Sequence, residues 1–363
     1  MTTTRPATIA DSAEKLTPQW LTQALTASGL LDGVAVSDAQ TTPLGTGQMC
    51  DSVRISVTYD GPTEAPTSLV AKLPAADPTS RNTAMMLRNY VKEVSFYREL
   101  IGTLSIRTPK VHYADIDESG VVFVLLMQDM APAEQGDQLA GCTPDVARAA
   151  LRELVGLHAP RWNDETLKSY PWLHTPPAEG ESMSRSMLPM LWNGFRDRYA
   201  ERLSADVMSA GTTLFENIGA YAADAGGPKT IVHGDYRLDN LLLGPQPDDV
   251  AVVDWQTIAL GTAASDAAYF VGAGLLPDVR REHEQDLIRT YYDDLVSAGV
   301  RDFTWDECWR DYRRATYAGL IMAVAASMLV ERTERGDEMF MTMAHRHTEH
   351  ALDLDAAETL VKS

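Results

Sequence analysis

The chain has 363 residues, of which 45% are hydrophobic and 23% are charged, a composition typical of soluble globular proteins. This length is too great for one ordinary compact core and favours two domains. Acidic residues outnumber basic ones by 51 to 31, and the resulting formal net charge of −20 argues against nucleic acid or an anionic membrane surface as a partner.

Cysteine usage and hydropathy bear on the cellular setting. The three cysteines are far apart and odd in number, so they predict neither a disulfide framework nor a zinc site. The N-terminal residues lack the apolar core of a signal peptide. The long uncharged run Ala315–Val330 is shorter than the ~20 residues of a membrane span and is better explained by a buried helix. We therefore expect a cytoplasmic protein, and the sequence leaves its oligomeric state open.

The N-terminal region contains one short predicted helix. Thr17 and Pro18 form a good helix start, with the threonine as cap and the proline as the first helical residue. Apolar residues then recur at helical spacing up to Gly29. We expect this helix to pack on the first lobe of the protein.

Residues 34–72 have the alternating pattern of β-strands. Gly45 and Gly47 lie in a probable turn between two of these strands. Such a turn could present backbone N–H groups to nucleotide phosphates. Taken alone, the same residues fit an ordinary hairpin turn better, because they lack the full pattern of a P-loop.

Lys72 ends the apolar strand SLVAKLP, where burying a lysine is costly unless its ammonium group finds a partner. A solvent-exposed lysine on an edge strand is the alternative. Asp77 opens a helix that we expect to run on through Arg81–Ile101, and Glu93 lies on its largely apolar stripe, whereas Glu99 does not. Glu93 is therefore the predicted partner of Lys72, with a solvated helix charge as the alternative.

The middle of the chain passes from strands to helices. The run Gly120–Met127 is almost uniformly apolar and predicts a strand that ends at the polar residues Gln128 and Asp129. From Pro144 onward the pattern is mostly helical, with an irregular stretch at residues 163–190. The second half of the chain is therefore expected to be a helical domain.

The segment IVHGDYRLDN places Asp235 and Asn240 at the interval at which kinases place a catalytic-loop carboxylate and a metal-binding amide. Asp235 would orient an acceptor hydroxyl and accept its proton, and Asn240 would offer an oxygen to Mg²⁺. Two apolar runs around GPQPDD predict a hairpin that returns Asp254 beside Asn240 as the main magnesium ligand. Taken singly, each of these residues is more often a cap or turn residue than a catalytic one. Taken together, they favour Mg²⁺-dependent phosphoryl transfer.

HGDYRLDN followed by VVDWQ resembles the kinase-like phosphotransferases, which include aminoglycoside phosphotransferases, choline kinases and the ecdysteroid kinase-like proteins. These have HGD where protein kinases have HRD. The resemblance covers roughly residues 40–330 and is weakest where the acceptor would bind. Tyr236 and Arg237 replace a leucine and a histidine that are common in this superfamily, which favours the ecdysteroid kinase-like branch.

The resemblance implies an α+β, bilobal protein-kinase-like fold with a small β-rich lobe and a larger helical lobe. We expect an N-terminal helical extension at residues 1–33, a nucleotide-binding lobe at 34–130, and a helical lobe with the catalytic loop and the acceptor site at 131–363. ATP or GTP, with Mg²⁺, would sit between the lobes.

The resemblance also implies which residues contact the nucleotide: Lys72, Glu93, Gly45, Gly47, Gln128 and Met130. Lys72 would hold the α and β phosphates, and Glu93 would orient Lys72. The glycine turn would cover the phosphates. The main chain around Gln128 and Met130 would contact the adenine edge, so side chains there say little about ATP against GTP.

Two further residues are expected to support the catalytic loop. By resemblance, His233 braces the loop, although a role as catalytic base is conceivable because its intrinsic pKa is near neutrality. Asp266 opens a helix and would hydrogen-bond the loop from behind. The aromatic residues Trp305, Trp309 and Tyr312 are expected to belong to the core rather than to an acceptor-binding wall.

The sequence thus predicts a kinase that transfers the γ-phosphate of ATP or GTP to a hydroxyl group of a small molecule. The alternatives are a catalytically silent nucleotide-binding scaffold and nucleotidyl transfer. The complete set of site residues argues against the scaffold. The acceptor stays open, because an antibiotic, a choline-like amine, a sugar and a polycyclic alcohol are all compatible with the motif.

Overall fold

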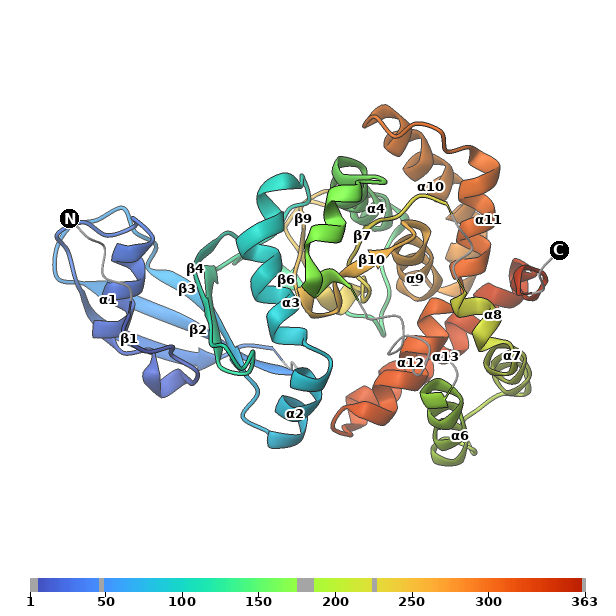
Figure 1. The fold of residues 1–363 in the computed structure, drawn as a ribbon, viewed down its shortest axis with the longest axis horizontal. Coiled ribbons are helices and arrows are strands. Elements are labelled where there is room, and N and C mark those ends of the chain that lie inside the picture. The colour runs from blue at the N-terminus through green and yellow to red at the C-terminus, as the bar shows by residue number, and fades with distance from the viewer. Residues whose placement is uncertain (1–5, 46–48, 175–185, 224–226, 361–363) are drawn as a thin grey trace. The chain divides into compact units, whose positions relative to one another are not determined.

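The structure is a computed structural model that describes residues 6–45, 49–174, 186–223 and 227–360 (Figure 1). The chain forms two compact units. The sheet-rich unit comprises Met1–Gly102, Thr108–Ala131 and Asp254–Gln256, and the helical unit comprises Thr103–Arg107, Pro132–Val253 and Thr257–Ser363. The α+β class expected from the sequence is confirmed.

The sheet-rich unit contains a five-stranded antiparallel sheet with the order β1-β2-β3-β5-β4. Its strands are β1 (Val36–Pro43), β2 (Cys50–Tyr59), β3 (Ser68–Pro74), β4 (Val111–Ile116) and β5 (Phe123–Gln128). In the register of this sheet, Lys72 on the central strand β3 is opposite Ser52 on β2 and Leu125 on β5. The edge-strand alternative for Lys72 is therefore wrong.

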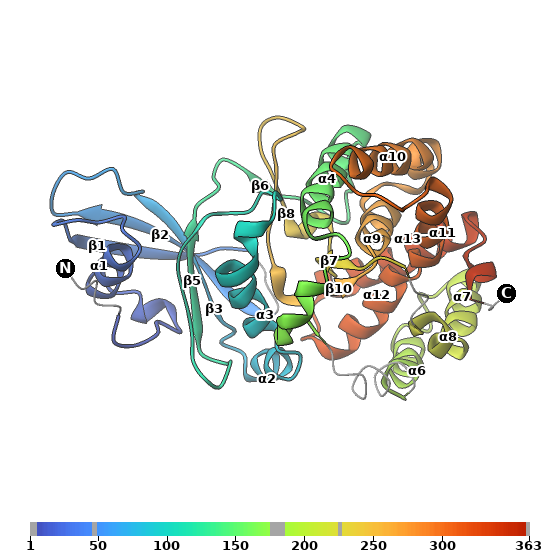
Figure 2. The ribbon, with the colours of Figure 1, turned by 45° about the horizontal axis from the view of Figure 1, so that its top comes forward.

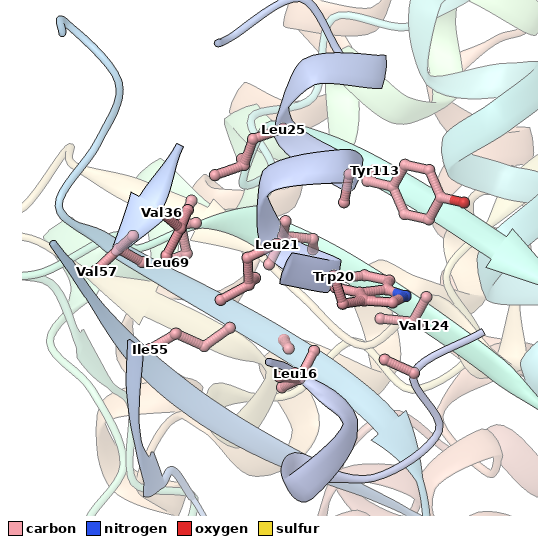
Figure 3. Close-up of a cluster of buried hydrophobic side chains, with 14 of the residues drawn as sticks. Leu16, Trp20, Leu21, Leu25, Val36, Ile55, Val57, Leu69, Tyr113 and Val124 are labelled. Carbon is pink, nitrogen blue, oxygen red and sulfur yellow. The ribbon is translucent and has the colours of Figure 1, made fainter. Parts of the chain in front are cut away.

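Helix α1 (Pro18–Ala27) supplies part of the core of this unit. The Thr17 side chain accepts a hydrogen bond from the Trp20 N–H and caps the helix, as its sequence suggested. Figure 3 shows Leu21 of α1 over Ile55 and Leu69 of the sheet. Because each fully buried side chain of this size contributes about 1.5–3 kcal/mol, α1 is part of the folded unit and not a loose extension.

The helix expected to continue from Asp77 to Ile101 is interrupted, which corrects the sequence prediction. Helix α2 (Pro78–Met86) ends where Arg88 takes a left-handed conformation with a φ of 58°, and α3 (Asn89–Ser95) follows and passes into a π-helical turn, Phe96–Leu100. The interruption gives α3 its own direction, so that Tyr90 and Glu93 are both fully buried. Neither glycine nor proline marks this point in the sequence.

The helical unit is built around α9 (Ala264–Gly274), which is buried along almost its whole length. Helices α4, α10, α11, α12 and α13 all contact α9, and Figure 2 shows it among them. The other helices of the unit are α4 (Pro144–His158), α6 (Leu188–Arg198), α7 (Ala205–Glu216), α8 (Ile218–Ala222), α10 (Pro277–Ser297), α11 (Trp305–Ala315), α12 (Ala318–Leu329) and α13 (Glu334–Asp353).

The long uncharged run of the sequence does not form one buried helix. It spans the end of α11 and the whole of α12, and only one face of α12, including Leu320 and Val324, is buried. Within the described ranges, no helix is both long and apolar enough to cross a membrane.

The described residues of the helical unit also form five short strands: β6 (Glu134–Gln135), β7 (Thr230–Val232), β8 (Leu241–Leu243), β9 (Val250–Val252) and β10 (Ala259–Gly261). β8 and β9 pair antiparallel, with Leu241 opposite Val252, which confirms the predicted hairpin. β6 extends this pair on the other side of β8, and β7 pairs with β10. The loop between β7 and β8 carries the HGDYRLDN motif.

Candidate active site

Lys72 lies at the centre of a buried ionic cluster in the sheet-rich unit. Its Nζ is 2.7 Å from Glu93 Oε1 and 2.8 Å from Asp254 Oδ1. Burial by itself would lower the pKa of the Lys72 ammonium, but the negative charges of Asp254 and Glu93 outweigh that effect and hold the pKa well above its usual range. Lys72 therefore stays charged, and the structure brings it together with the glutamate that the sequence selected.

Glu93 also holds the chain segment next to Asp254. Its Oε1 accepts a hydrogen bond from the Trp255 N–H at 3.3 Å, and the Trp255 ring stacks on Phe96 with ring centroids 3.9 Å apart. Asp254 has a left-handed backbone conformation with a φ of 67°, which is uncommon for a residue with a side chain. One glutamate thus fixes both the lysine and the segment that carries Asp254.

The catalytic loop of the helical unit is supported from behind by Asp266 of α9. The N–H groups of His233 and Gly234 donate to the two Asp266 carboxylate oxygens at 2.7 and 2.9 Å. Gly234 has a φ of 81°, and a Cβ at this position would lie only 2.7 Å from the Thr257 carbonyl oxygen. The loop therefore requires glycine here, and Asp266 supports it as expected.

His233 connects the loop to the end of the hairpin. Its Nδ1 accepts the Asp235 N–H at 3.3 Å, and its Nε2 lies 3.0 Å from the Val253 carbonyl oxygen. Because Nδ1 is an acceptor, Nε2 carries the proton and donates to that carbonyl. Both ring nitrogens are engaged in holding backbone, so His233 braces the loop and is not placed to act as a base.

The Asp235 carboxylate is oriented by three donors of the helical unit. Tyr269 donates its hydroxyl to Oδ1 at 2.6 Å. The Asn240 Nδ2 and the Arg237 Nε donate to Oδ2 at 3.0 and 3.2 Å. Donors from three directions fix the plane of the carboxylate, which is the condition for aligning a reacting hydroxyl group.

Asn240 is fixed at the other end of the motif. Its Nδ2 donates to the Asp235 carbonyl oxygen at 2.8 Å as well as to the Asp235 side chain. Since both partners are acceptors, the amide nitrogen faces Asp235 and the amide oxygen points away from it. The Val253 N–H donates to the Asn240 carbonyl oxygen at 3.0 Å, and Asp254 is the next residue in the chain.

Asp239, beside Asn240 in the sequence, belongs to a bracing network. It accepts hydrogen bonds from Arg237, from the Gln138 N–H at 3.0 Å, and from Arg335 of α13, which contacts both carboxylate oxygens at 3.2 Å. Burial opposes ionisation, but the hydrogen bonds from Arg335 and the charge of Arg237 hold the pKa of Asp239 below its usual range. Arg237 thus joins Asp235 to this second carboxylate.

Tyr269 is a site residue that the sequence prediction missed. Its ring packs in a nearly parallel stack on His347 of α13, with centroids 5.5 Å apart and an interplanar angle of 13°. Burial first, and then the charge of His350, lower the pKa of His347 well below its usual range, so this imidazole is neutral. One signal was available, because Tyr269 follows Asp266 by three residues, about one helical turn.

The remaining predicted nucleotide contacts lie at the ends of strands in the sheet-rich unit. Gly45 follows β1 with a φ of 75°, as a turn glycine does, and Gly47 lies outside the described residues. Gln128 ends β5 with an exposed side chain, and Met130 is partly buried. The carboxylate of Asp129 between them is held by Arg54 at 2.8 Å and Ser68 at 2.5 Å.

The sequence was compared with models of known protein families. The model of the ecdysteroid kinase-like family matches residues 47–301, which is more than half of the chain and includes both clusters described above. The chain belongs to the ecdysteroid kinase-like family. The branch suggested by the sequence motif is therefore confirmed. The curated mouse protein acyl-CoA dehydrogenase family member 10 is 42% identical to this ecdysteroid kinase-like chain over 65 residues, which cover 16% of the chain and only 6% of the mouse protein.

Several solved structures with a fold similar to that of this ecdysteroid kinase-like protein are named as phosphotransferases or kinases. A putative aminoglycoside phosphotransferase from Ralstonia eutropha JMP134 is 17% identical with a TM-score of 0.51, covering 92% of this chain and 98% of that one. Wild-type aminoglycoside 2'-phosphotransferase-IIIa in complex with GDP is 12% identical with a TM-score of 0.52 and the same coverage. Choline kinase from Cryptosporidium parvum Iowa II is 10% identical with a TM-score of 0.51, covering 87% and 89%. These likenesses establish the kinase-like bilobal fold.

Proposed function

We propose that this protein transfers the γ-phosphate of ATP or GTP to a hydroxyl group of a small molecule. One observation carries the proposal: the Asp235 carboxylate is fixed by three donors, one of which is Asn240 at the kinase-like interval. Family membership and the similar structures, which include a GDP complex, support a nucleotide-dependent phosphotransferase.

In the proposed reaction, Asp235 aligns the acceptor hydroxyl with the γ-phosphorus. A bond forms between the acceptor oxygen and that phosphorus, and the bond from phosphorus to the β–γ bridging oxygen breaks. The hydroxyl proton moves to Asp235, and the nucleoside diphosphate keeps the bridging oxygen. Positioning contributes most, because the transferred group carries its charge on oxygens that the protein only has to hold and neutralise.

Lys72 is the proposed phosphate ligand, with Glu93 as its positioning partner. Its charge is secured by two carboxylates, so it is cationic over the whole physiological pH range. When nucleotide binds, the Lys72 ammonium would exchange part of its contact with Asp254 for phosphate oxygens. Gly45 and the main chain near Gln128 and Met130 are the proposed contacts for phosphates and base.

Magnesium would be held by Asn240 and Asp254. The donor chemistry fits, since an amide oxygen directed away from Asp235 and a carboxylate are the hard oxygen ligands that this ion prefers. The described residues contain no group of three or more His, Cys, Asp or Glu side chains that could hold a metal. Such a sparse donor set suits Mg²⁺, which keeps several waters and takes phosphate oxygens as ligands. When bound, the ion would neutralise charge on the phosphate oxygens.

The direct test is a search for phosphorylated product. The protein is incubated with Mg-ATP or Mg-GTP and a pooled library of amino alcohols, aminoglycosides, sugars and sterols, and products are detected by mass spectrometry. We expect a product that gains one phosphoryl group and is absent with Asp235→Ala. That variant should still bind Mg-nucleotide, because Lys72 and Asp254 are unchanged.

Three outcomes would contradict the proposal. A nucleoside monophosphate as co-product would indicate nucleotidyl transfer. Nucleotide binding without turnover of any acceptor or of water would favour a silent scaffold. Full activity of Asp235→Ala toward a genuine acceptor would show that the assignment of roles is wrong.

A further inference from the structure

Tyr269 makes the shortest of the three hydrogen bonds to the proposed catalytic aspartate. Its hydroxyl lies 2.6 Å from Asp235 Oδ1, whereas the Asn240 and Arg237 donors lie 3.0 and 3.2 Å from Oδ2. Hydrogen bonds to an ionised acceptor are shorter and stronger than those between neutral groups. Tyr269 is 4% exposed and sits on α9, the central helix of its unit.

The two carboxylate oxygens of Asp235 differ in how many further hydrogen bonds they can accept. Each carboxylate oxygen has two lone-pair sites. Among the described residues, Oδ2 receives two donors and Oδ1 receives only the Tyr269 hydroxyl. One lone-pair site of Oδ1 is therefore available to a further donor, and it adjoins the tyrosine hydroxyl.

We propose that the acceptor hydroxyl binds to Oδ1 of Asp235 and that Tyr269 is a positioning residue, which shares this oxygen and aims its remaining lone pair. This inference rests on the proposed function. Tyr269 does not transfer a proton itself. The acceptor proton moves to Oδ1 while the Tyr269 O–H bond stays intact, and the Tyr269 hydrogen bond weakens as Oδ1 loses its charge.

The surroundings of Tyr269 suit this role. Burial, and then the charge of Asp235, raise the pKa of Tyr269 well above its usual value, so the phenol remains a donor. The neutral ring of His347 lies against the tyrosine ring and fixes its orientation. Gly272 and Gly319 leave room for His347, since a Cβ at Gly319 would lie 1.9 Å from His347 Nε2 and a Cβ at Gly272 would lie 2.6 Å from His347 Nδ1. The tyrosine is thus held by α9 and α13 together.

The hydrogen bond also fixes how Asp235 faces the acceptor. A short hydrogen bond from a buried hydroxyl holds Oδ1 in one position, so that its remaining lone pair stays aligned with the acceptor hydroxyl. Removing only the tyrosine hydroxyl should impair the chemical step and leave nucleotide binding unchanged.

The test is Tyr269→Phe, which keeps the ring on His347 and removes the donor. Turnover is measured with the acceptor found in the product search, or with water as acceptor through phosphate release from Mg-ATP. We expect kcat to fall about tenfold with the KM for nucleotide unchanged.

Tyr199→Phe is the matched control. Tyr199 is also buried and donates its hydroxyl to a carboxylate, Asp337 Oδ1, at the same distance of 2.6 Å. It should lose comparable stability while keeping the kcat of the unmodified protein. Equal kinetic effects of the two substitutions would show that Tyr269 acts only through folding, and would overturn the proposal.

A measurement without turnover completes the test. In NMR spectra of protein with ¹³C-labelled tyrosine Cζ, the Tyr269 signal should shift in Asp235→Asn. An unmoved signal would show that the hydrogen bond is absent and overturn the proposal.

The kinetic results distinguish this inference from the proposed function. Turnover that does not need Asp235 would refute the proposed function. Turnover that needs Asp235 but is unaffected in Tyr269→Phe would refute only this inference.

Discussion

The two units hold their site residues in different ways. In the sheet-rich unit, a buried lysine is balanced by Glu93 and Asp254, and each member depends on the others for its charge. In the helical unit, Asp235 is held by one neutral hydroxyl, one amide and one guanidinium, and behind these stand Asp239 and its own donors. Replacing one member of the first cluster should therefore cause a large loss of unfolding free energy. Replacing one residue around Asp235 should cause a smaller loss, because the other donors remain.

The largest expected effect is in the ionic cluster. Lys72→Met leaves the buried Glu93 carboxylate without its cation and next to the partly exposed Asp254, and breaking the buried Lys72–Glu93 pair in this way costs about 3–5 kcal/mol of unfolding free energy. Nucleotide affinity should fall with it. Chemical denaturation and nucleotide titration would measure both. In the same unit, Arg54→Met removes one partner of Asp129, whose side chain is 8% exposed but keeps the Ser68 hydroxyl and the Ala131 N–H, so it should cost less, about 1–2 kcal/mol. Similar losses for the two variants would contradict the comparison.

The next effect concerns the stack behind Tyr269. A Cβ in Gly319→Ala would lie 1.9 Å from His347 Nε2, so the imidazole must move. We expect a loss of about 1–3 kcal/mol in unfolding free energy, together with a lower kcat. Gly219→Ala is the control, because a Cβ there meets nothing within 4 Å and alanine favours a helix. Retention of normal kcat by Gly319→Ala would show that the stack does not position the aspartate.

A pH effect of intermediate size follows from His347 and His350. Both pKa values are lowered in the folded protein, chiefly by burial, so the unfolded chain binds protons that the folded one does not. Unfolding free energy should therefore rise with pH up to about 6.5 and fall below it, by up to about 1.4 kcal/mol per pH unit for each histidine. Denaturation at several pH values measures this slope. An NMR titration showing His347 protonated near its usual pKa would contradict it.

The smallest effect on unfolding free energy is expected from Arg335, which contacts Asp239 at the surface of the helical unit. Arg335 is 47% exposed at its side chain, and Asp239 keeps Arg237 and the Gln138 N–H when it is removed. Arg335→Gln should therefore cost less than about 1 kcal/mol by urea denaturation. Arg237→Gln should cost more, because it takes a donor from Asp235 and Asp239 together. The reverse order would place the main support of the loop in α13.

The motif-bearing parts of the molecule could be predicted from the sequence. Strands β1, β2, β3 and β5, the β8–β9 hairpin and the capped start of α1 all follow from local alternation, turn residues and capping, which act over a few positions. The prediction that Glu93, and not Glu99, pairs with Lys72 is also confirmed, because the apolar stripe of a helix indicates which side faces the core. The family follows from HGDYRLDN and VVDWQ.

The break at Arg88 could not be predicted in this way. Residues that commonly end helices, glycine and proline, are missing there, and the interruption is stabilised by what it allows α3 to bury. A helix that satisfies local preferences can be divided when two shorter helices pack better. The local pattern therefore predicted which residues are helical here, but it wrongly predicted one continuous helix in place of two.

The sequence by itself determined the class of fold, the family and the residues proposed to act on the nucleotide, because these depend on short-range spacing. Only the tertiary structure decided what holds them. Tyr269 meets Asp235 across 34 positions of sequence, and Arg335 meets Asp239 across 96. Such contacts depend on how α9 and α13 pack against the catalytic loop, and no local pattern encodes that packing. The candidate site residues could therefore be identified from the motif, whereas the contacts that orient them could not.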